Sequence, residues 1–187
     1  MNIILASQSP RRKELMQLLS LPFTIRVADI DEHMAPDKPP YDEVARVSRE
    51  KAAAINCDSQ DIVIAADTIV VCEGNVLGKP ADDDEAFRTL SLLSGKIHQV
   101  MTGLTVRQGD RCVTCTEVSD IYFRSLSPEE IRRYIATGDC RDKAGAYGIQ
   151  SGGALFVEKL VGDFYNVMGL PVCRLNQILK SFLEEAQ

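Results

Sequence analysis

The sequence predicts an α/β fold with a mixed central β-sheet flanked by helices. Strand-like and helix-like apolar patterns alternate along the first half of the chain, which is typical of crossovers between parallel strands. Later strand-like runs are joined by short glycine turns, which is typical of antiparallel hairpins. The 187 residues are 45% hydrophobic and 26% charged. This suits one globular domain over residues 1–187, with a core that needs no disulfides.

The first half of the chain opens with a short apolar run and a capped helix. Ser9 is a good N-cap residue and Pro10 favours the first helical position, so a helix is expected to begin there. Leu15, Leu18 and Leu19 are expected to form its apolar face. The expected elements are a strand at 3–6, a helix at 10–20, a strand at 23–27, an acidic loop at 29–40, a helix at 42–55 and a strand at 62–71 that is broken at Asp67-Thr68.

The second half carries strong turn and capping signals. Glu73-Gly74-Asn75 and Gln108-Gly109-Asp110 are typical hairpin turns, and Ser127-Pro128-Glu129-Glu130 is a full capping box. The expected elements are a strand at 76–77, a helix at 82–94 capped by Asp82, a hairpin of strands at 97–106 and 112–123, a helix ending at Gly138, an irregular segment at 139–153, a hairpin of 154–160 with 164–168, and a helix from about Pro171.

The composition of the chain limits the kinds of molecule that it is expected to bind. The net charge of −6 argues against a protein that binds nucleic acid through phosphate neutralisation, but it leaves a small anionic ligand open. No run of 18 apolar residues predicts a membrane span, and residues 1–6 lack the features of a signal peptide, so a cytoplasmic protein is expected. The six cysteines are expected to be reduced and buried, and the Cys112-Val113-Thr114-Cys115 pair to be neither a zinc nor a redox site.

Two arginines stand where a helix does not favour cations. Arg11 and Arg12 lie in the first turn after Ser9, at the positive end of the helix dipole, which costs about 0.3–1 kcal/mol each when exposed. An anion bound at that end would remove the conflict, since backbone N–H groups, the Ser7 and Ser9 hydroxyls and two guanidiniums would converge on it. The alternative is that both arginines simply extend into solvent.

A second conflict is a carboxylate inside an apolar strand. Asp67 interrupts the run Ile62-Val63-Ile64-Ala65-Ala66, and a buried carboxylate is costly unless it is paired or binds a metal. Asp67 is therefore a candidate general base or metal ligand. An aspartate that caps a loop at a strand end is the alternative.

Other polar residues give weaker signals. Lys79 precedes Pro80 in a segment without the spacing of a P-loop, and Lys51 alone is typical of a solvated helix face. The acidic loop with Asp31 and Glu32 could supply carboxylates to a hard cation or could merely be soluble. Gln150 ends a glycine-rich segment against which a planar base could lie, its amide offering a donor and an acceptor. A tight connection that uses glycine for its geometry is equally open.

Six motifs occur in order along the chain. They are Leu5-Ala6-Ser7-Gln8-Ser9-Pro10-Arg11-Arg12, Arg49-Glu50-Lys51-Ala52, Ala66-Asp67-Thr68, Leu77-Gly78-Lys79-Pro80, Ser94-Gly95 with His98-Gln99-Val100, and Lys143-Ala144-Gly145-Ala146-Tyr147-Gly148-Ile149-Gln150. Taken together, they resemble the Maf family of nucleotide pyrophosphatases over nearly the whole chain, and the last motif is similar to the branch that acts on dTTP and UTP.

The resemblance implies hydrolysis of a nucleoside triphosphate to the monophosphate and pyrophosphate with a divalent metal, Mg or Mn. It implies a two-lobed, ITPase-like mixed α/β fold with the site in the cleft between the lobes. Asp67 would be the general base on the attacking water, and Glu32 would help to place metal or water. The residues that would hold the phosphates are Ser7, Arg11, Arg12, Lys51 and Lys79, and those linked to substrate choice are Arg12, Thr68 and Gln150.

Several alternatives stay open at this stage. The chain could be a nucleotide-binding regulator of division or septum formation, could have 7-methyl-GTP specificity, or could be a phosphatase or kinase of another fold, although a Walker motif is missing. The expected partner is a small-molecule nucleotide, with no nucleic acid and no membrane, and a homodimer is left open.

Overall fold

The computed structural model describes residues 1–27 and 29–184 and divides into two compact units. The first unit contains Met1–Asp67, Thr102–Glu117 and the described residues from Gly169 onward. The second unit contains Thr68–Met101 and Val118–Met168. The prediction of one domain over residues 1–187, like that of a cleft, stays a prediction.

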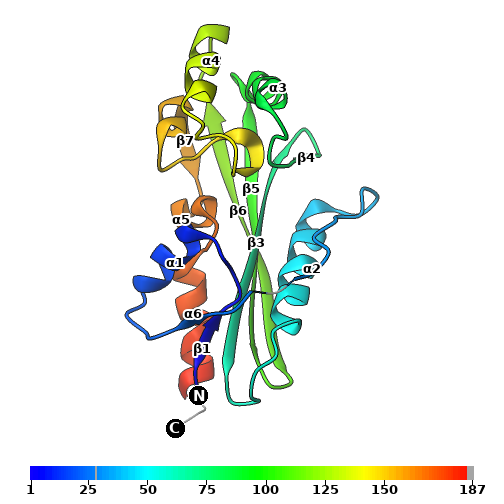
Figure 1. Ribbon diagram of the computed structural model, residues 1–187, viewed down its shortest axis with the longest axis vertical. Coiled ribbons are helices and arrows are strands. Elements are labelled where there is room, and N and C mark those ends of the chain that lie inside the picture. The colour runs from blue at the N-terminus through cyan, green and yellow to red at the C-terminus, as the bar shows by residue number, and fades with distance from the viewer. Residues whose placement is uncertain (28, 185–187) are drawn as a thin grey trace. The chain divides into compact units, whose positions relative to one another are not determined.

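The described residues form one seven-stranded sheet in the order β2-β1-β3-β5-β6-β7, with β4 paired to β3 (Figure 1). The strands are β1 Ile3–Leu5, β2 Thr24–Ile25, β3 Ile62–Cys72, β4 Asn75–Leu77, β5 Ile97–Gln108, β6 Arg111–Phe123 and β7 Val157–Val161. The helices are α1 Pro10–Gln17, α2 Pro40–Ala53, α3 Asp83–Leu93, α4 Pro128–Ala136, α5 Phe164–Met168 and α6 Val172–Glu184, with 3-10 helices η1 Ala144–Ala146 and η2 Gly152–Phe156.

The sheet is mixed, as predicted. Strand β1 runs parallel to β2 and to β3, because α1 and the longer connection through α2 are crossovers. Strand β4 is antiparallel to β3 and β7 is antiparallel to β6. Glu73 and Gly74 have φ of 52° and 81°, the left-handed conformation that a two-residue hairpin turn requires. None of the described helices is long and apolar enough to cross a membrane.

In the first unit, Figure 1 shows α2 on one side of β3 and helices α1 and α6 on the other. Ala52 and Ile55 pack against Val63 and Ala65, which lie on the same face of β3. Leu175, Leu179 and Phe182 are the buried residues of α6, and the helix itself begins near Pro171 as predicted. The first unit therefore buries both faces of its strands, which explains why β3 is apolar on both faces.

In the second unit, the core gathers α3, α4, η1 and η2 against the strands. Phe123 lies at its centre and makes edge-to-face contacts with His98, Tyr147 and Phe156. The predicted capping box is present, since the Ser127 side chain accepts from the Glu130 backbone and the Glu130 side chain accepts from the Ser127 backbone. Asp82 caps α3 as predicted.

Several predictions about secondary structure are wrong. Helix α1 ends at Gln17, so Leu18 lies beyond the helical periodicity and is exposed, and Met16 is buried instead. Strand β3 is continuous through Asp67, because a side-chain partner rather than a backbone break accommodates the carboxylate. Residues 164–168 form α5 rather than a strand, since the Asp163 carboxylate accepts the Tyr165 backbone N–H. Strand β2 is shorter than expected, only Thr24–Ile25.

The cysteine prediction holds in part. The structure gives all six cysteines as free thiols. Only Cys72 and Cys140 are buried, whereas Cys112 and Cys173 are exposed. Cys112 is exposed because it lies near the hairpin end of β6, where an apolar run need not be covered.

Helix α2 approaches β5 so closely that only glycine fits at position 103. A Cβ atom on Gly103 would overlap the Val44 carbonyl oxygen and lie 2.6 Å from the Val44 carbonyl carbon. We expect Gly103→Ala to lower the free energy of unfolding by about 3 kcal/mol, because backbone atoms cannot rotate away as a side chain can. Urea unfolding measures this. Gly78→Ala is the control, since nothing lies within 4 Å of its Cβ position. Equal stability of the two variants would contradict the close approach.

His98 makes the stability of the second unit depend on pH. Burial lowers the pKa of His98 to about 4, its Nε2 lies 2.8 Å from Tyr147 Oη, and its Nδ1 has no hydrogen-bond partner among the described residues. The unfolded chain takes up this proton at about pH 6.5, so stability present above that pH is lost as the pH falls toward 4.

We expect a loss on the order of 3 kcal/mol over this range, measured as the urea unfolding free energy at several pH values. His98→Phe should flatten the slope, whereas replacing the exposed His33 by Gln should leave it unchanged. A slope that survives His98→Phe would rule out His98 as its source.

Candidate active site

The N-terminus of α1 holds Arg12 in a fixed position. Ser9 caps the helix by accepting the Arg12 backbone N–H, and Ser7 Oγ accepts the Ser9 backbone N–H at 3.2 Å. The Arg12 guanidinium donates through Nε to the Gly169 carbonyl at 2.7 Å and through Nη1 to Ser7 Oγ at 3.4 Å. No acidic residue occupies this first turn. Arg12 is therefore turned back toward the helix N-terminus rather than extended into solvent, which favours the anion-site interpretation.

Asp67 lies on the face of β3 that contacts α2. Side chains alternate along a strand, so Asp67 shares this face with Val63 and Ala65. Lys51 of α2 reaches it, and its Nζ lies 2.8 Å from Asp67 Oδ1. The side chains of Lys51 and Asp67 are only 10% and 11% exposed. The prediction that Lys51 belongs to a solvated helix face is wrong, because its ammonium is half of a buried ion pair.

Glu32 completes a charged cluster in the first unit. Lys51 Nζ also lies 3.0 Å from Glu32 Oε1, and the Glu32 side chain is 57% exposed. Burial lowers the pKa of Arg12, whereas the nearby charges of Asp67 and Glu32 raise it and that of Arg11 lowers it. Arginine stays protonated in either case. We call Ser7, Arg12, Glu32, Lys51 and Asp67 the first-unit cluster. Its residues come from the β1–α1 connection, α1, the acidic loop, α2 and β3.

The charges of the first-unit cluster indicate whether a bound triphosphate would need a metal ion to neutralise it. Two carboxylates balance Arg12 and Lys51, so a triphosphate would add negative charge that the cluster does not neutralise. Magnesium commonly binds one or two protein carboxylates together with substrate phosphates and water, so Asp67 and Glu32 fit such an ion as a partial ligand set. Among residues 1–27 and 29–184, no group of three His, Cys, Asp or Glu side chains could hold a metal by itself.

The other predicted residues are placed as follows. Arg11 is half-buried in α1 of the first unit. Thr68, Lys79 and Gln150 belong to the second unit, where Thr68 is half-buried in β3 and the other two are exposed. Lys79 lies just beyond the β3–β4 hairpin, since β4 ends at Leu77 and only Gly78 separates the two residues. The roles given to these residues stay predictions.

Tyr147 does not offer a surface for a nucleobase. Its ring is 5% exposed, and it packs edge-to-face against Phe123 and His98. The aromatic residue of the glycine-rich segment is therefore part of the core. The exposed Gln150 lies three residues farther along, at the end of the same segment.

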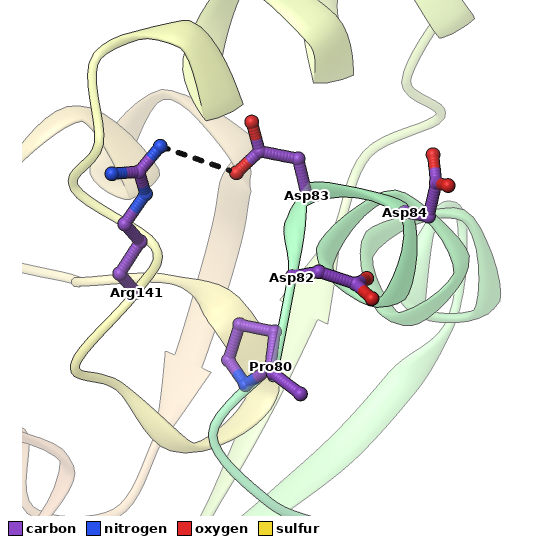
Figure 2. Close-up of a pocket in the computed structure, with 6 residues that line it drawn as sticks. Pro80, Asp82, Asp83, Asp84 and Arg141 are labelled. Atoms are coloured by element: carbon purple, nitrogen blue, oxygen red, sulfur yellow. Dashed lines mark hydrogen bonds and ion pairs between the residues drawn. The ribbon is translucent and has the colours of Figure 1, made fainter.

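A pocket of about 650 Å³ lies at the start of α3 (Figure 2). Three of its six lining residues are aspartates. Figure 2 shows Asp83 directed at Arg141, whose Nη2 lies 3.5 Å from Asp83 Oδ1. Three carboxylates at a helix N-terminus are explained by the helix dipole, and they would repel a polyphosphate. This pocket does not fit the predicted anion. It is lined by Pro80, Ala81, Asp82, Asp83, Asp84 and Arg141.

Sequence reasoning missed several residues that position the site. The carbonyl of Gly169 holds Arg12, but it is a backbone atom 157 residues away and leaves no signal in a side-chain pattern. Asp139 and Tyr134 anchor the segment that contains Gln150. A signal for Asp139 was present, since it precedes the glycine-rich segment with Lys143 four residues later.

The sequence is similar to known proteins over nearly its whole length. The family described as Maf-like protein matches residues 2–182. A protein of Syntrophomonas wolfei named dTTP/UTP pyrophosphatase is 48% identical over 178 residues, 94% of each chain. One of the same name from Bacillus cereus strain B4264 is 46% identical over 181 residues, covering 96% of this chain and 95% of the relative.

Solved structures give the same fold at low sequence identity. The Ham1 protein of Staphylococcus aureus has a TM-score of 0.52 at 14% identity, covering all of both chains. A HAM1 protein from Coxiella burnetii has a TM-score of 0.51 at 16% identity, covering 97% of this chain and 99% of the other. At this identity the likeness confirms the predicted mixed α/β architecture and nothing finer.

We expect the Lys51–Asp67 pair to show strong energetic coupling. Lys51→Met leaves a buried carboxylate without this partner and should cost about 3 kcal/mol of unfolding free energy. Asp67→Asn in the same chain should restore part of that loss, giving a coupling energy above about 1 kcal/mol in a double-mutant cycle measured by urea unfolding.

The matched control is the exposed pair of Arg141 and Asp83, whose side chains are 70% and 59% exposed. Its cycle should give less than about 1 kcal/mol. Additive effects of Lys51→Met and Asp67→Asn would show that the buried pair contributes no specific interaction.

Proposed function

Because the chain belongs to the Maf family, we propose that it hydrolyses dTTP and UTP to the monophosphate and pyrophosphate. Relatives that are 46–48% identical over nearly the full length carry that activity in their names. The observation that carries the proposal is the first-unit cluster, in which a buried Asp67 lies near the Arg12 guanidinium at a helix N-terminus. A carboxylate beside fixed cations supplies both a base and an anion site.

Asp67 acts as the general base. Lys51 holds its Oδ1 at 2.8 Å, which fixes the carboxylate in one orientation within a water-poor environment. Asp67 takes a proton from a water, and the water oxygen attacks the α-phosphorus of the nucleotide. The bond between the α-phosphorus and the bridging oxygen breaks, so pyrophosphate leaves with the electron pair. Direct attack by water fits the absence of a nucleophile pattern such as G-x-S-x-G in the sequence.

The phosphates are held by cations and hydroxyls. Arg12 is already fixed by the Gly169 carbonyl, so little side-chain freedom is lost when it binds a phosphate oxygen. Ser7 and Arg11 adjoin it, and Lys51 lies between the two carboxylates. Lys79 neutralises the leaving pyrophosphate. These groups stabilise the charge that develops on the equatorial and leaving oxygens.

A divalent cation, Mg or Mn, completes the proposed chemistry. Asp67 and Glu32 would hold it, and when bound it supplies positive charge that neutralises the phosphate oxygens. Glu32 suits this role because its side chain is largely exposed next to Lys51 and can turn toward a ligand.

Substrate choice falls to Arg12, Thr68 and Gln150. A glutamine amide presents a donor and an acceptor side by side, as reading a pyrimidine edge requires. Modified pyrimidine nucleotides are included in the proposed substrate class. Specificity for 7-methyl-GTP and a purely regulatory nucleotide-binding role are the alternatives. A protein that only binds nucleotide needs the cations but has no need to bury Asp67, so the cluster favours catalysis.

Asp67→Asn should lower kcat by about 10²–10⁴-fold, because an amide cannot take up the proton from water. The measurement is chromatographic separation of products from dTTP with Mg or Mn, and circular dichroism confirms the fold. Asp61→Asn is the matched control, since Asp61 is a buried aspartate of the same unit that accepts hydrogen bonds from Asn2 instead.

The control should keep its turnover, and wild-type activity should disappear with chelator and return with the metal. Full activity of Asp67→Asn would remove Asp67 from its role. Release of diphosphate and phosphate would contradict attack at the α-phosphorus, and wild-type binding without turnover would favour the regulator.

A further inference from the structure

A half-buried carboxylate in the second unit anchors the segment that ends at Gln150. Asp139 follows α4, and its two oxygens receive three side-chain donors. Lys143 Nζ donates to Oδ1 at 3.0 Å, and Oδ2 accepts the hydroxyls of Tyr134 at 2.7 Å and Ser151 at 2.5 Å. We call Tyr134, Asp139, Lys143 and Ser151 the Asp139 clamp.

The clamp holds the backbone on both sides of Gln150. The Gly148 backbone N–H donates to Tyr134 Oη at 3.1 Å, and the Ser151 backbone N–H donates to the Gly148 carbonyl at 3.2 Å. Ser151, the next residue after Gln150, is tied to Asp139 through its hydroxyl. Gln150 itself is exposed. The result is an accessible amide carried on a backbone fixed from both ends.

Glycines allow the backbone of this segment to pack closely. A Cβ on Gly153 would lie 2.7 Å from the Gly148 carbonyl oxygen, so the backbone at Gly153 packs directly against the backbone at Gly148. Gly145 has φ of 69°, and its N–H donates to the Gly78 carbonyl at 3.1 Å, one residue before Lys79. The same segment thus adjoins the turn that carries a proposed phosphate-binding lysine.

The Asp139 clamp is a charged network that is partly buried. The side chains of Lys143 and Asp139 are 12% and 23% exposed. Burial raises the pKa of Asp139, but hydrogen bonds from Ser151, Tyr134 and Lys143 outweigh it and hold the pKa below its usual value. Burial and the Asp139 hydrogen bond raise the pKa of Tyr134, so its hydroxyl keeps the proton it donates. An ordinary loop anchor needs no such charge, since apolar packing would stabilise it as well.

We propose that Asp139 is a positioning residue for nucleobase selection, acting through Tyr134 and Ser151 on the backbone that carries the Gln150 amide. This rests on the proposed function. Uracil and thymine present two carbonyl acceptors flanking an N–H donor, and one amide pairs with part of that edge only when its approach is fixed. A preformed segment loses little freedom on binding, so the selectivity of Gln150 depends on the clamp.

The experiment compares kcat and KM for dTTP, UTP, dCTP and GTP in four variants. These are Asp139→Asn, Gln150→Ala, the double variant, and the control Glu130→Gln. Glu130 is also a carboxylate of the α4 region, but it accepts from Arg124 at 2.7 Å and from the Ser127 backbone, outside the clamp. Thermal melting of each variant measures stability separately from selectivity.

Asp139→Asn should reduce the preference for dTTP and UTP by about tenfold, chiefly through a higher KM. Gln150→Ala should lose the same preference, and adding Asp139→Asn to it should change the preference no further. Glu130→Gln should lower the melting temperature and keep the preference. If Asp139→Asn does not fold, Ser151→Ala and Tyr134→Phe replace it, because each removes one contact of the clamp.

Several results would overturn the positioning role. These are an unchanged preference in Asp139→Asn, an equal loss for all four nucleotides, or a further loss in the Gln150→Ala background. If the wild type hydrolyses none of these triphosphates, the proposed function fails instead. Nucleotide dissociation constants of the same variants then decide whether the clamp sets selectivity, and a wild type that binds none of the four nucleotides overturns both proposals.

Discussion

The structure depends on one buried ion pair between Lys51 and Asp67. A carboxylate in a central strand has little contact with water, so its charge is tolerated only if a partner lies at hydrogen-bond distance. Helix α2 supplies that partner, with Nζ 2.8 Å from Oδ1. The position of α2 relative to β3 is therefore as important to the site as the two residues themselves.

Close packing constrains that position. Gly103 lets the α2 backbone touch β5, and a hydroxyl chain from Ser48 through Thr105 to Thr114 continues the contact, with successive oxygens 2.8 and 2.9 Å apart. Both Ser48 and Thr105 are fully buried. A helix held by backbone contact and directional hydrogen bonds cannot slide as one held only by apolar side chains can, so the reach of Lys51 is fixed.

Sequence reasoning singles out residues that conflict with their local surroundings. Arg12 opposes a helix dipole and Asp67 interrupts an apolar strand, and both conflicts are visible within ten residues of sequence. Lys51 presents no such conflict, because a lysine suits a helix surface and only the tertiary contact buries it. The same limit applies to Leu18, which lies one residue beyond the end of α1, and to α5, where the Asp163 cap outweighs an alternating apolar pattern. Gly169 contributes only a backbone carbonyl, which no composition or periodicity reveals.

Each unit contains a lysine that bridges two carboxylates, but the two arrangements differ in their chemistry. In each, a lysine bridges a less exposed carboxylate and a more exposed one: Lys51 joins Asp67 and Glu32, and Lys143 joins Asp139 and Asp142. Asp139, however, receives donors on both oxygens and has a lowered pKa, which makes it a poor acceptor for a further proton. Its chemistry is that of a fixed anchor. Asp67 lies instead beside the Arg12 guanidinium and a carboxylate that reaches solvent, where a polyphosphate and its counter-ion can approach. Burial and a lysine partner alone therefore do not distinguish the proposed general base from an anchor. The nearby cations make the distinction, because they would bring a phosphate within reach of Asp67.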